Sequence, residues 1–252
     1  MKGNAQEITT ALLYRTIEPL EARRHFNLGM KDAPDFSFAR GTHIVPLTAV
    51  EFVQAARHYP IVFNADETAT PVALVGIESR QNVFVEASGN WAEGCYVPAF
   101  IRRYPFILLK VSDDAGKPDI QLCIDRAAPH LTEEGGKPLF DPETHAPTAL
   151  LEKIGRFNAD YHREQARTRR FIAACMQHDL FVPRSVDFET DSGEHLQIKG
   201  FMAIDQQRLQ ALPDDVVIDW WRKGYLPLAL AHFSSLGNFG RLIHRFRRLA
   251  ST

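Results

Sequence analysis

The residues of this chain that could react covalently or bind a metal ion are scattered, and few of them are suitably spaced. His162 and Glu164 lie two residues apart on a predicted helix, where their side chains point to nearly opposite sides. Cys175 and His178 are three residues apart on the same helix and could form a thiol–imidazole pair, but a cysteine on an apolar helix face is more often part of the core. The sequence has no nucleophile elbow, no P-loop and no glycine motif for a dinucleotide. We therefore predict no catalytic residue, no bound metal ion and no cofactor.

A group of polar residues interrupts the apolar stripe of a long helix that the sequence predicts from Thr148 to about His178. Buried polar groups need partners, so this group either hydrogen-bonds to neighbouring elements or lines a cavity. Both interpretations stay open at this point. For a cavity, the candidate ligand-binding residues are four from the interruption and three others: Tyr161, Glu164, Gln165, Thr168, Arg167, Arg102 and Asp125.

The C-terminal region offers a second candidate surface, for docking a partner protein. Trp220 and Trp221 are adjacent, so on a helix they diverge by about 100° and do not both fit easily into one small core. Trp, Tyr and Arg are favoured at interface hot spots. The alternative is that one Trp belongs to the core and the other packs against a neighbouring helix. The candidate docking residues are Trp220, Trp221, Tyr225, Phe233, Arg241 and Arg245.

Two stretches in the N-terminal half of the chain resemble each other. VPLTAVEFVQAARHYPIVF covers residues 45–63, and YVPAFIRRYPFILL covers residues 96–109. Thr48 and Glu51 fit a capping box that begins a helix over residues 49–58, and Pro60 ends it. Neither stretch combines a nucleophile, a base or metal ligands. We interpret both as turn-to-strand junctions, in which a tyrosine packs and the following proline is either cis or trans.

The remaining pattern predicts an α+β fold. Strand candidates at residues 61–63, 71–77, 82–86, 106–111 and 120–124 indicate a mostly antiparallel sheet in the N-terminal half. The long helix is followed by a hairpin over residues 185–204 and by a helical C-terminal region. We expect one compact domain with three parts: an extended segment (1–44), a sheet-bearing region (45–146), and a region of long helix, hairpin and C-terminal helices (147–252).

Composition narrows the classes of partner and the compartment. A formal net charge of −2 and a pI near 6.6 give no general attraction to nucleic acid or anionic lipid. No run of eighteen apolar residues is present, so we expect no integral membrane segment. The chain has three cysteines, far apart, which favours reduced thiols and a cytoplasmic protein.

Short segments that span nearly all of residues 12–243, in order, carry a family resemblance. They are residues 45–52, 59–63, 96–98, 102–106, 122–125, 138–140, 164, 167–168, 171, 200–201, 204–205, 209, 211–213 and 235–238. In these segments the chain resembles the SapC family of bacterial proteins. The resemblance implies a pathway shared with flavin-dependent halogenases, cupin-like proteins and outer-membrane receptors, beside which such proteins are encoded, and a protein or peptide partner from that neighbourhood. It implies no catalytic residue.

Three hypotheses for function follow. The first is a non-catalytic accessory or binding protein that docks a partner protein, a peptide or a small ligand. The second is an enzyme whose site is assembled from dispersed polar residues. The third, which follows the origin of the family's name in a surface-layer gene region, is a surface-layer-associated protein. The sequence favours the first, and it leaves the oligomeric state open.

Overall fold

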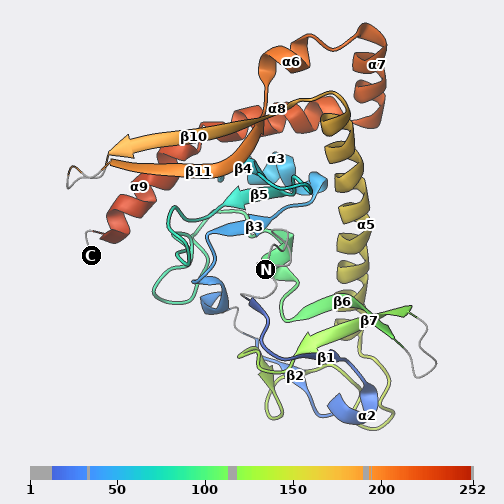
Figure 1. Ribbon diagram of the computed structural model, residues 1–252. Helices are drawn as coiled ribbons and strands as arrows, with labels where there is room; N and C mark the ends of the chain where they lie inside the picture. The colour runs from blue at the N-terminus through green and yellow to red at the C-terminus, as the bar shows by residue number, and fades with distance from the viewer. Residues whose placement is uncertain (1–12, 33–34, 113–117, 190–192, 194, 251–252) are drawn as a thin grey trace.

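Antiparallel strands dominate the first half of the chain, a long helix follows, and the chain ends in helices (Figure 1). This α+β arrangement is the predicted fold class. It is seen in a computed structural model that describes residues 13–32, 35–112, 118–189, 193 and 195–250.

A five-stranded antiparallel sheet joins the two halves of the chain. Its strand order is β10-β11-β4-β5-β3, and the strands are β3 (Ile44–Pro46), β4 (Ile61–Asn64), β5 (Pro71–Leu74), β10 (Phe181–Glu189) and β11 (His195–Ile204). The hairpin β10–β11 is the one that the sequence predicts. It pairs with β4 through Phe201 opposite Asn64 and Met202 opposite Phe63. The expected regions 45–146 and 147–252 therefore share one sheet.

The prediction of a single sheet from the strands of the N-terminal half was wrong. β6 (Phe106–Ser112) and β7 (Pro118–Asp125) form a second antiparallel sheet with β1 (Ile17–Pro19). β5 pairs with β4 on one edge and with β3 on the other, so neither edge is open to β6. A third small sheet contains β8 (Leu131–Thr132), β2 (Gly29–Met30) and β9 (Lys137–Pro138).

The strand expected over residues 82–86 is also absent, apart from one isolated bridge between Val85 and Trp91. Separate backbone bonds, such as that from the Val83 N–H to the Val75 carbonyl at 2.8 Å, and the Asn82 side chain take the place of a strand ladder. The Asn82 amide nitrogen donates to the Ala39 carbonyl at 3.1 Å, and its oxygen accepts from the Phe84 N–H at 2.9 Å. These bonds satisfy the buried backbone within a loop.

The helix expected over residues 49–58 is shorter than predicted. It consists of a 3-10 turn, η2 (Ala49–Glu51), followed by α3 (Phe52–Ala55). Past its end, the Asn238 amide donates to the Ala56 carbonyl at 2.7 Å and to the Tyr59 carbonyl at 3.2 Å. The side chain of the distant Asn238 thus donates to carbonyls that would accept backbone N–H groups if the helix continued.

The two Tyr-Pro junctions pack as predicted, with Tyr59 and Tyr104 both buried. The Tyr59 hydroxyl accepts from the Trp91 ring N–H at 2.8 Å, and the Tyr104 ring stacks on Phe38 at 4.1 Å. The Tyr104–Pro105 peptide bond is cis. Both junctions therefore have a structural role, because the tyrosine of each is packed within the core.

The segment expected to be extended, residues 1–44, is partly folded. Its residues 1–12 and 33–34 lie outside the described residues, while the rest contains β1, α2 (Ala22–His25), β2 and the 3-10 turn η1 (Ser37–Ala39). Phe36 and Phe38 are partly buried and pack against the core.

The long helix α5 (Ala149–Gln177) is the predicted one, and it runs beside both larger sheets (Figure 1). The C-terminal helices are α6 (Gln206–Gln210), α7 (Asp214–Lys223), α8 (Tyr225–Leu236) and α9 (Phe239–Ala250). Gly224 ends α7 in the left-handed conformation (φ 72°), which glycine adopts without strain. α4 (Ala99–Arg102) precedes β6 in the chain, and the centre of its Phe100 ring lies 6.4 Å from that of Tyr161 on α5.

Candidate functional site

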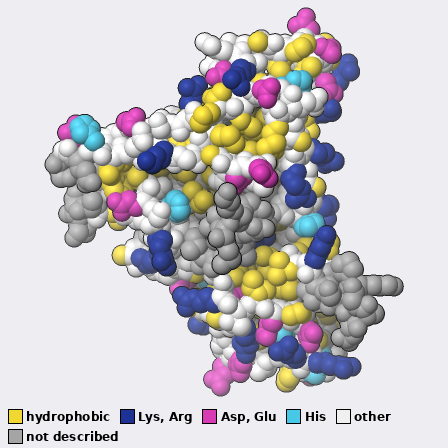
Figure 2. Space-filling view, viewed as in Figure 1, with side chains coloured by type: hydrophobic (Ala, Val, Ile, Leu, Met, Phe, Trp, Pro, Cys, Tyr) yellow, Lys and Arg dark blue, Asp and Glu magenta, His cyan; other side chains and the backbone are white. Residues whose placement is uncertain are grey.

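The inner face of α5 carries the polar interruption that the sequence shows. The helix begins at Thr148, whose hydroxyl accepts from the Leu151 N–H, and Leu151, Phe171 and Cys175 are buried along it. Tyr161 and Thr168 are buried on the same face. Figure 2 shows Lys and Arg side chains along the outer edge of this helix, which leaves the inner face for contacts within the protein.

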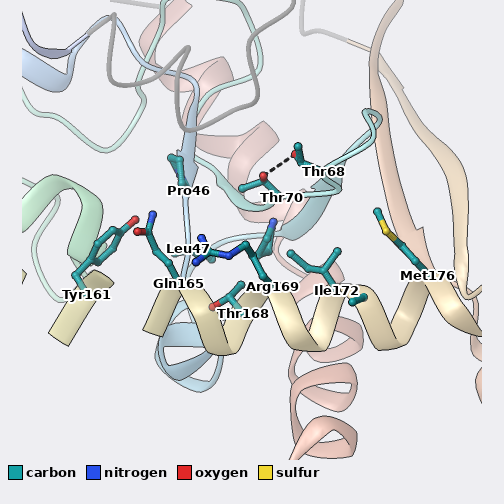
Figure 3. Close-up of a pocket in the computed structure, with 12 residues that line it drawn as sticks. Pro46, Leu47, Thr68, Thr70, Tyr161, Gln165, Thr168, Arg169, Ile172 and Met176 are labelled. Carbon is teal, nitrogen blue, oxygen red and sulfur yellow. Dashed lines mark hydrogen bonds between the residues drawn. The ribbon is translucent and has the colours of Figure 1, made fainter. Parts of the chain in front are cut away.

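Three residues of the interruption meet in a cavity of about 320 Å³ between α5 and the β3–β5 end of the sheet. Tyr161, Gln165, Arg169, Ile172 and Met176 point from α5 to one side, toward Pro46, Thr68 and Thr70 (Figure 3). We call this cavity the α5–β5 pocket. Its lining residues are Pro46, Leu47, Thr68, Thr70, Pro71, Tyr161, Gln165, Thr168, Arg169, Ile172, Ala173 and Met176.

Thr168 has a structural role at the edge of the α5–β5 pocket. Its hydroxyl donates to the Glu164 carbonyl at 2.7 Å and accepts from the Ala49 N–H at 2.8 Å. The second bond satisfies a free N–H at the start of η2, a position where a helix has no internal acceptor. The interruption thus does both things that the sequence left open: Thr168 bonds to a neighbouring element, and Tyr161 and Gln165 line a cavity.

Tyr161 reaches the pocket from a crowded position. Burial raises the pKa of its hydroxyl above the ordinary value, and the nearby Arg103 guanidinium opposes that rise. The Arg103 carbon Cζ lies 4.7 Å from the centre of the Tyr161 ring. Among the described residues, no hydrogen bond is made by the Tyr161 hydroxyl. It is therefore available to a ligand as donor and acceptor.

Four other candidates for ligand binding lie outside the α5–β5 pocket. Glu164 and Arg167 face each other along α5, with Oε2 and Nη1 4.0 Å apart. Arg102 donates to the Val97 carbonyl at 2.9 Å and to the Tyr96 hydroxyl at 3.0 Å, and it lines a different pocket. The structure therefore does not assemble all seven candidates into one site.

Asp125, the fourth of these, is a buried structural carboxylate. It accepts the N–H groups of Arg15 and Thr16, each at 2.9 Å, that of Ala127 at 3.1 Å, and the Tyr104 hydroxyl at 3.0 Å. Its oxygens are occupied by groups that hold β1, β7 and the second Tyr-Pro junction together. With four donors on its two oxygens, this carboxylate has no free acceptor site for a ligand.

Glu51 is a second buried carboxylate, and it connects the two similar stretches. Oε2 accepts from the Thr48 N–H at 2.8 Å, which is the carboxylate's bond in the predicted capping box, and it also accepts from the Thr48 hydroxyl at 2.8 Å. Oε1 accepts from the Ala99 N–H at 2.7 Å and from the Tyr96 hydroxyl at 3.0 Å. Burial, and then the Glu51 charge, raise the pKa of Tyr96 to about 12. One carboxylate thereby begins both η2 and α4.

The thiol–imidazole pair on α5 is not assembled. Cys175 is fully buried, and burial raises the pKa of its thiol. The His178 ring lies edge-on to Trp220, with centroids 6.0 Å apart. A protonated thiol in apolar surroundings is a poor nucleophile. Among the described residues, no group of three His, Cys, Asp or Glu side chains could hold a metal ion.

The six candidate docking residues do not form one surface. Trp220 and Tyr225 are buried and pack on Phe171, with ring centroids 6.2 and 5.5 Å from it. Trp221 is 68% exposed, so the interpretation of one core Trp holds for Trp220. Phe233 is half-buried on α8.

The two arginines of that group are held by α9 against other parts of the fold. Arg241 donates to the Arg57 carbonyl at 2.8 Å, and the Arg245 guanidinium lies 4.7 Å from the centre of the Phe84 ring. Both contacts tie α9 to the N-terminal half. Of the six candidate docking residues, Trp221 is the aromatic one that is exposed.

Comparison with known proteins adds one result to this geometry. The model of the SapC family matches residues 20–242 of the 252 residues. The chain belongs to the SapC family. No curated protein and no solved structure matches it significantly. In the part of the chain that the structure describes, no helix is long and apolar enough to cross a membrane.

Several segments that resemble the SapC family hold the core together. The Ser235 hydroxyl accepts from the Ile61 N–H at 2.9 Å, and Asn238 closes the end of α3 as described above. With the bonds of Glu51 and Asp125, these contacts link segments that are far apart in the SapC sequence. These four residues of the SapC-like segments therefore build the scaffold.

Two residues with unusual surroundings were not singled out from the sequence. Arg103 and Asn158 are 4% and 2% exposed, and both carry polar atoms without a partner among the described residues. The adjacent arginines of the SapC-like Arg102–Arg103 pair were the available signal. The sequence analysis named Arg102 and not Arg103. A pair of adjacent residues does not reveal which of the two side chains turns inward.

Proposed function

We propose that this SapC-family chain is a non-catalytic binding protein whose α5–β5 pocket holds a small organic ligand. The observation that carries the proposal is the placement of Tyr161 and Gln165, polar residues on the inner face of α5, in a cavity of about 320 Å³. That volume is at the lower end of the range of small-molecule sites, which begins at about 300 Å³.

The lining of the pocket indicates an amphipathic ligand. Leu47, Ile172 and Met176 offer apolar surface, and the Tyr161 hydroxyl offers a hydrogen bond. Arg169 is exposed at the pocket and has no ion-pair partner among the described residues. A ligand with an apolar body and a polar or anionic end complements this set.

The state of the ionisable groups supports binding rather than catalysis. The carboxylates of Glu51 and Asp125 accept hydrogen bonds from the backbone, and the thiol of Cys175 is held protonated by burial. General acid–base or covalent catalysis needs such a group within reach of the substrate. The α5–β5 pocket has none of these three in its lining.

The wider setting is part of the same proposal. We place the protein in the bacterial cytoplasm, where its three free cysteines would stay reduced. It would act as an accessory component of a pathway, alongside a partner protein of the kinds that the family resemblance implies. Cell fractionation tests the placement, since recovery in the surface layer would support the surface-layer hypothesis instead.

Retention of a ligand tests the proposed function directly. The protein is incubated with a bacterial metabolite extract and separated by gel filtration, and bound compounds are released and identified by mass spectrometry. Ala173→Phe, which projects a ring into the pocket, is expected to lower retention about tenfold, equivalent to 1.4 kcal/mol. Arg170→Phe, at an exposed position of α5 outside the pocket, is the matched control and should retain the compound as the parent does.

Three results would count against the proposal. Equal retention by both variants, or no retained compound, would remove the α5–β5 pocket as the binding site. Release of the compound in a chemically altered form would favour the enzyme hypothesis.

A further inference from the structure

A second cavity, of about 380 Å³, lies between the first turns of α5 and the start of β6. We call it the α5–β6 pocket, after Arg103, Phe106, Lys153, Phe157 and Asn158, which line it from the two sides. It is distinct from the α5–β5 pocket, with which it shares no lining residue.

Arg103 is the unusual group of this pocket. Its side chain is almost fully buried, and its carbon Cζ lies 4.2 Å from the centre of the Phe100 ring and 4.7 Å from that of Tyr161. Among the described residues, neither Nε nor Nη2 has a hydrogen-bond acceptor. The guanidinium does act on the Tyr14 hydroxyl, where it opposes the effect of burial, which raises that pKa to about 12.

The two unsatisfied nitrogens are a matched pair. The N–H groups on Nε and Nη2 point from the same edge of the planar guanidinium, and this edge binds both oxygens of a carboxylate. Two buried N–H groups of a cation without acceptors are destabilising, so their persistence needs an explanation. The aromatic rings hold the plane of the group in place before a ligand arrives.

Asn158 supplies a complementary acceptor. Its amide nitrogen donates to the Ile154 carbonyl at 3.0 Å, and its buried oxygen Oδ1 has no donor among the described residues. The pocket therefore presents one unsatisfied pair of donors and one unsatisfied acceptor. A ligand that carries a hydroxyl or an ammonium group beside a carboxylate satisfies both.

The charges around the pocket favour an anion. Its lining contains five cationic side chains and one carboxylate: Lys31, Arg102, Arg103, Lys137, Lys153 and Asp32. Asp32 is already paired with Lys137 at 2.6 Å, with both side chains largely exposed. This excess of positive charge stands out in a chain whose net charge is −2.

We propose that the α5–β6 pocket binds a small amphipathic carboxylate, and that Arg103 donates hydrogen bonds from Nε and Nη2 to the two carboxylate oxygens. Asn158 accepts a hydrogen bond from a hydroxyl or ammonium group of the ligand, and Phe157 and Phe106 contact its apolar part. A carboxylate fits better than a phosphate, because Arg103 is the one buried cation of the lining and the other four cationic side chains, of Lys31, Arg102, Lys137 and Lys153, are exposed to water. The proposal concerns a different cavity from that of the proposed function, so either can fail alone.

The test follows the Arg103 side chain by NMR while defined probes are added. We expect 3-phenyllactate, an aromatic hydroxy carboxylate, to shift the Arg103 Nε–H signal and the Asn158 amide signal. The neutral analogue 3-phenyllactamide should need at least tenfold more ligand for the same shift. Arg103→Lys keeps the charge but loses the flat pair of donors, and it should weaken binding of 3-phenyllactate about tenfold or more.

A surface variant keeps the test independent of folding. Lys153→Glu reverses an exposed charge of the lining and should weaken binding several-fold, whereas Arg156→Glu, exposed on the same helix and outside the lining, should change it less than twofold. The proposal is overturned by no shift of the Arg103 signal up to about 20 mM probe, far above a millimolar Kd. Equal binding of the carboxylate and the amide, or tighter binding of inorganic phosphate than of 3-phenyllactate, would overturn it too.

Discussion

Replacement of Glu51 by glutamine should destabilise the protein strongly, although the two side chains have nearly the same shape. The carboxylate accepts from two backbone N–H groups, of Thr48 and Ala99, and from two hydroxyls, of Thr48 and Tyr96. Glutamine has one acceptor oxygen, so in either orientation its NH₂ group faces one of the backbone N–H groups. The hydroxyls can turn to accept from it, but a backbone N–H cannot.

The magnitude follows from the bonds that are lost or weakened. A hydrogen bond to a charged group contributes about 1.5–3 kcal/mol, and an unsatisfied buried donor costs about 1–3 kcal/mol. One backbone N–H loses its acceptor and the others lose the charge, so we expect a loss of about 2–4 kcal/mol in Glu51→Gln. That is a large fraction of the roughly 5–15 kcal/mol by which a typical domain is stable.

Urea unfolding followed by far-UV circular dichroism and tryptophan fluorescence measures this loss. Glu67→Gln, at an exposed position between β4 and β5, removes the same charge and should change the free energy of unfolding by less than about 0.5 kcal/mol. Hydrogen exchange at the Thr48 and Ala99 amides should accelerate in Glu51→Gln. If the two variants are equally stable, Glu51 does not connect η2 and α4 energetically, and the reasoning fails.

Three further predictions use the same unfolding measurement. Thr168→Val removes the acceptor of the Ala49 N–H and should cost about 1–2 kcal/mol; an unchanged stability would show that this N–H finds another partner. Burial lowers the pKa of His232 to about 4. Because the folded pKa lies below the unfolded value of about 6.5, stability is complete above that value and is lost as the pH falls toward 4, by about 2 kcal/mol between pH 7 and pH 5. His232→Asn should lack this part of the pH dependence, and an unaltered profile would refute the assignment. Trp220→Ala should cost about 3–5 kcal/mol and Trp221→Ala less than about 0.5 kcal/mol, and similar losses would contradict their opposite burial.

Local signals in the sequence predicted the local structure well. The capping box of Thr48 and Glu51 is formed at the predicted place, and α5 begins directly after Thr148. The hairpin β10–β11 follows from alternation around a turn-forming segment. Each of these features depends on residues that are close in sequence, where propensity and hydrogen bonding act together.

The pairing of the strands could not be predicted in the same way. The sequence placed residues 61–63 and 106–111 in one sheet, because both are short apolar runs in the same half of the chain. β4 instead pairs with β11, and nothing in either strand alone selects that distant partner. Register and partner choice come from packing over the whole molecule.

The same limit applies to the candidate sites. Tyr161, Gln165 and Thr168 were chosen because they interrupt an apolar stripe, and the structure brings them to one cavity. Arg103 was passed over in favour of Arg102, because burial of one arginine of an adjacent pair depends on which rings surround it. Those rings, Phe100 and Tyr161, come from two different helices.

The pairing of β4 with β11 also determines when this protein can fold in a cell. β4 leaves the ribosome more than 130 residues before Phe201 and Met202, its partners in the hairpin. At a synthesis rate of about 5–20 residues per second, the open side of β4 waits roughly 7–27 s for them. During that interval an unpaired strand edge is exposed to other nascent chains, so a chaperone that shields the emerging N-terminal half should raise the yield of native protein.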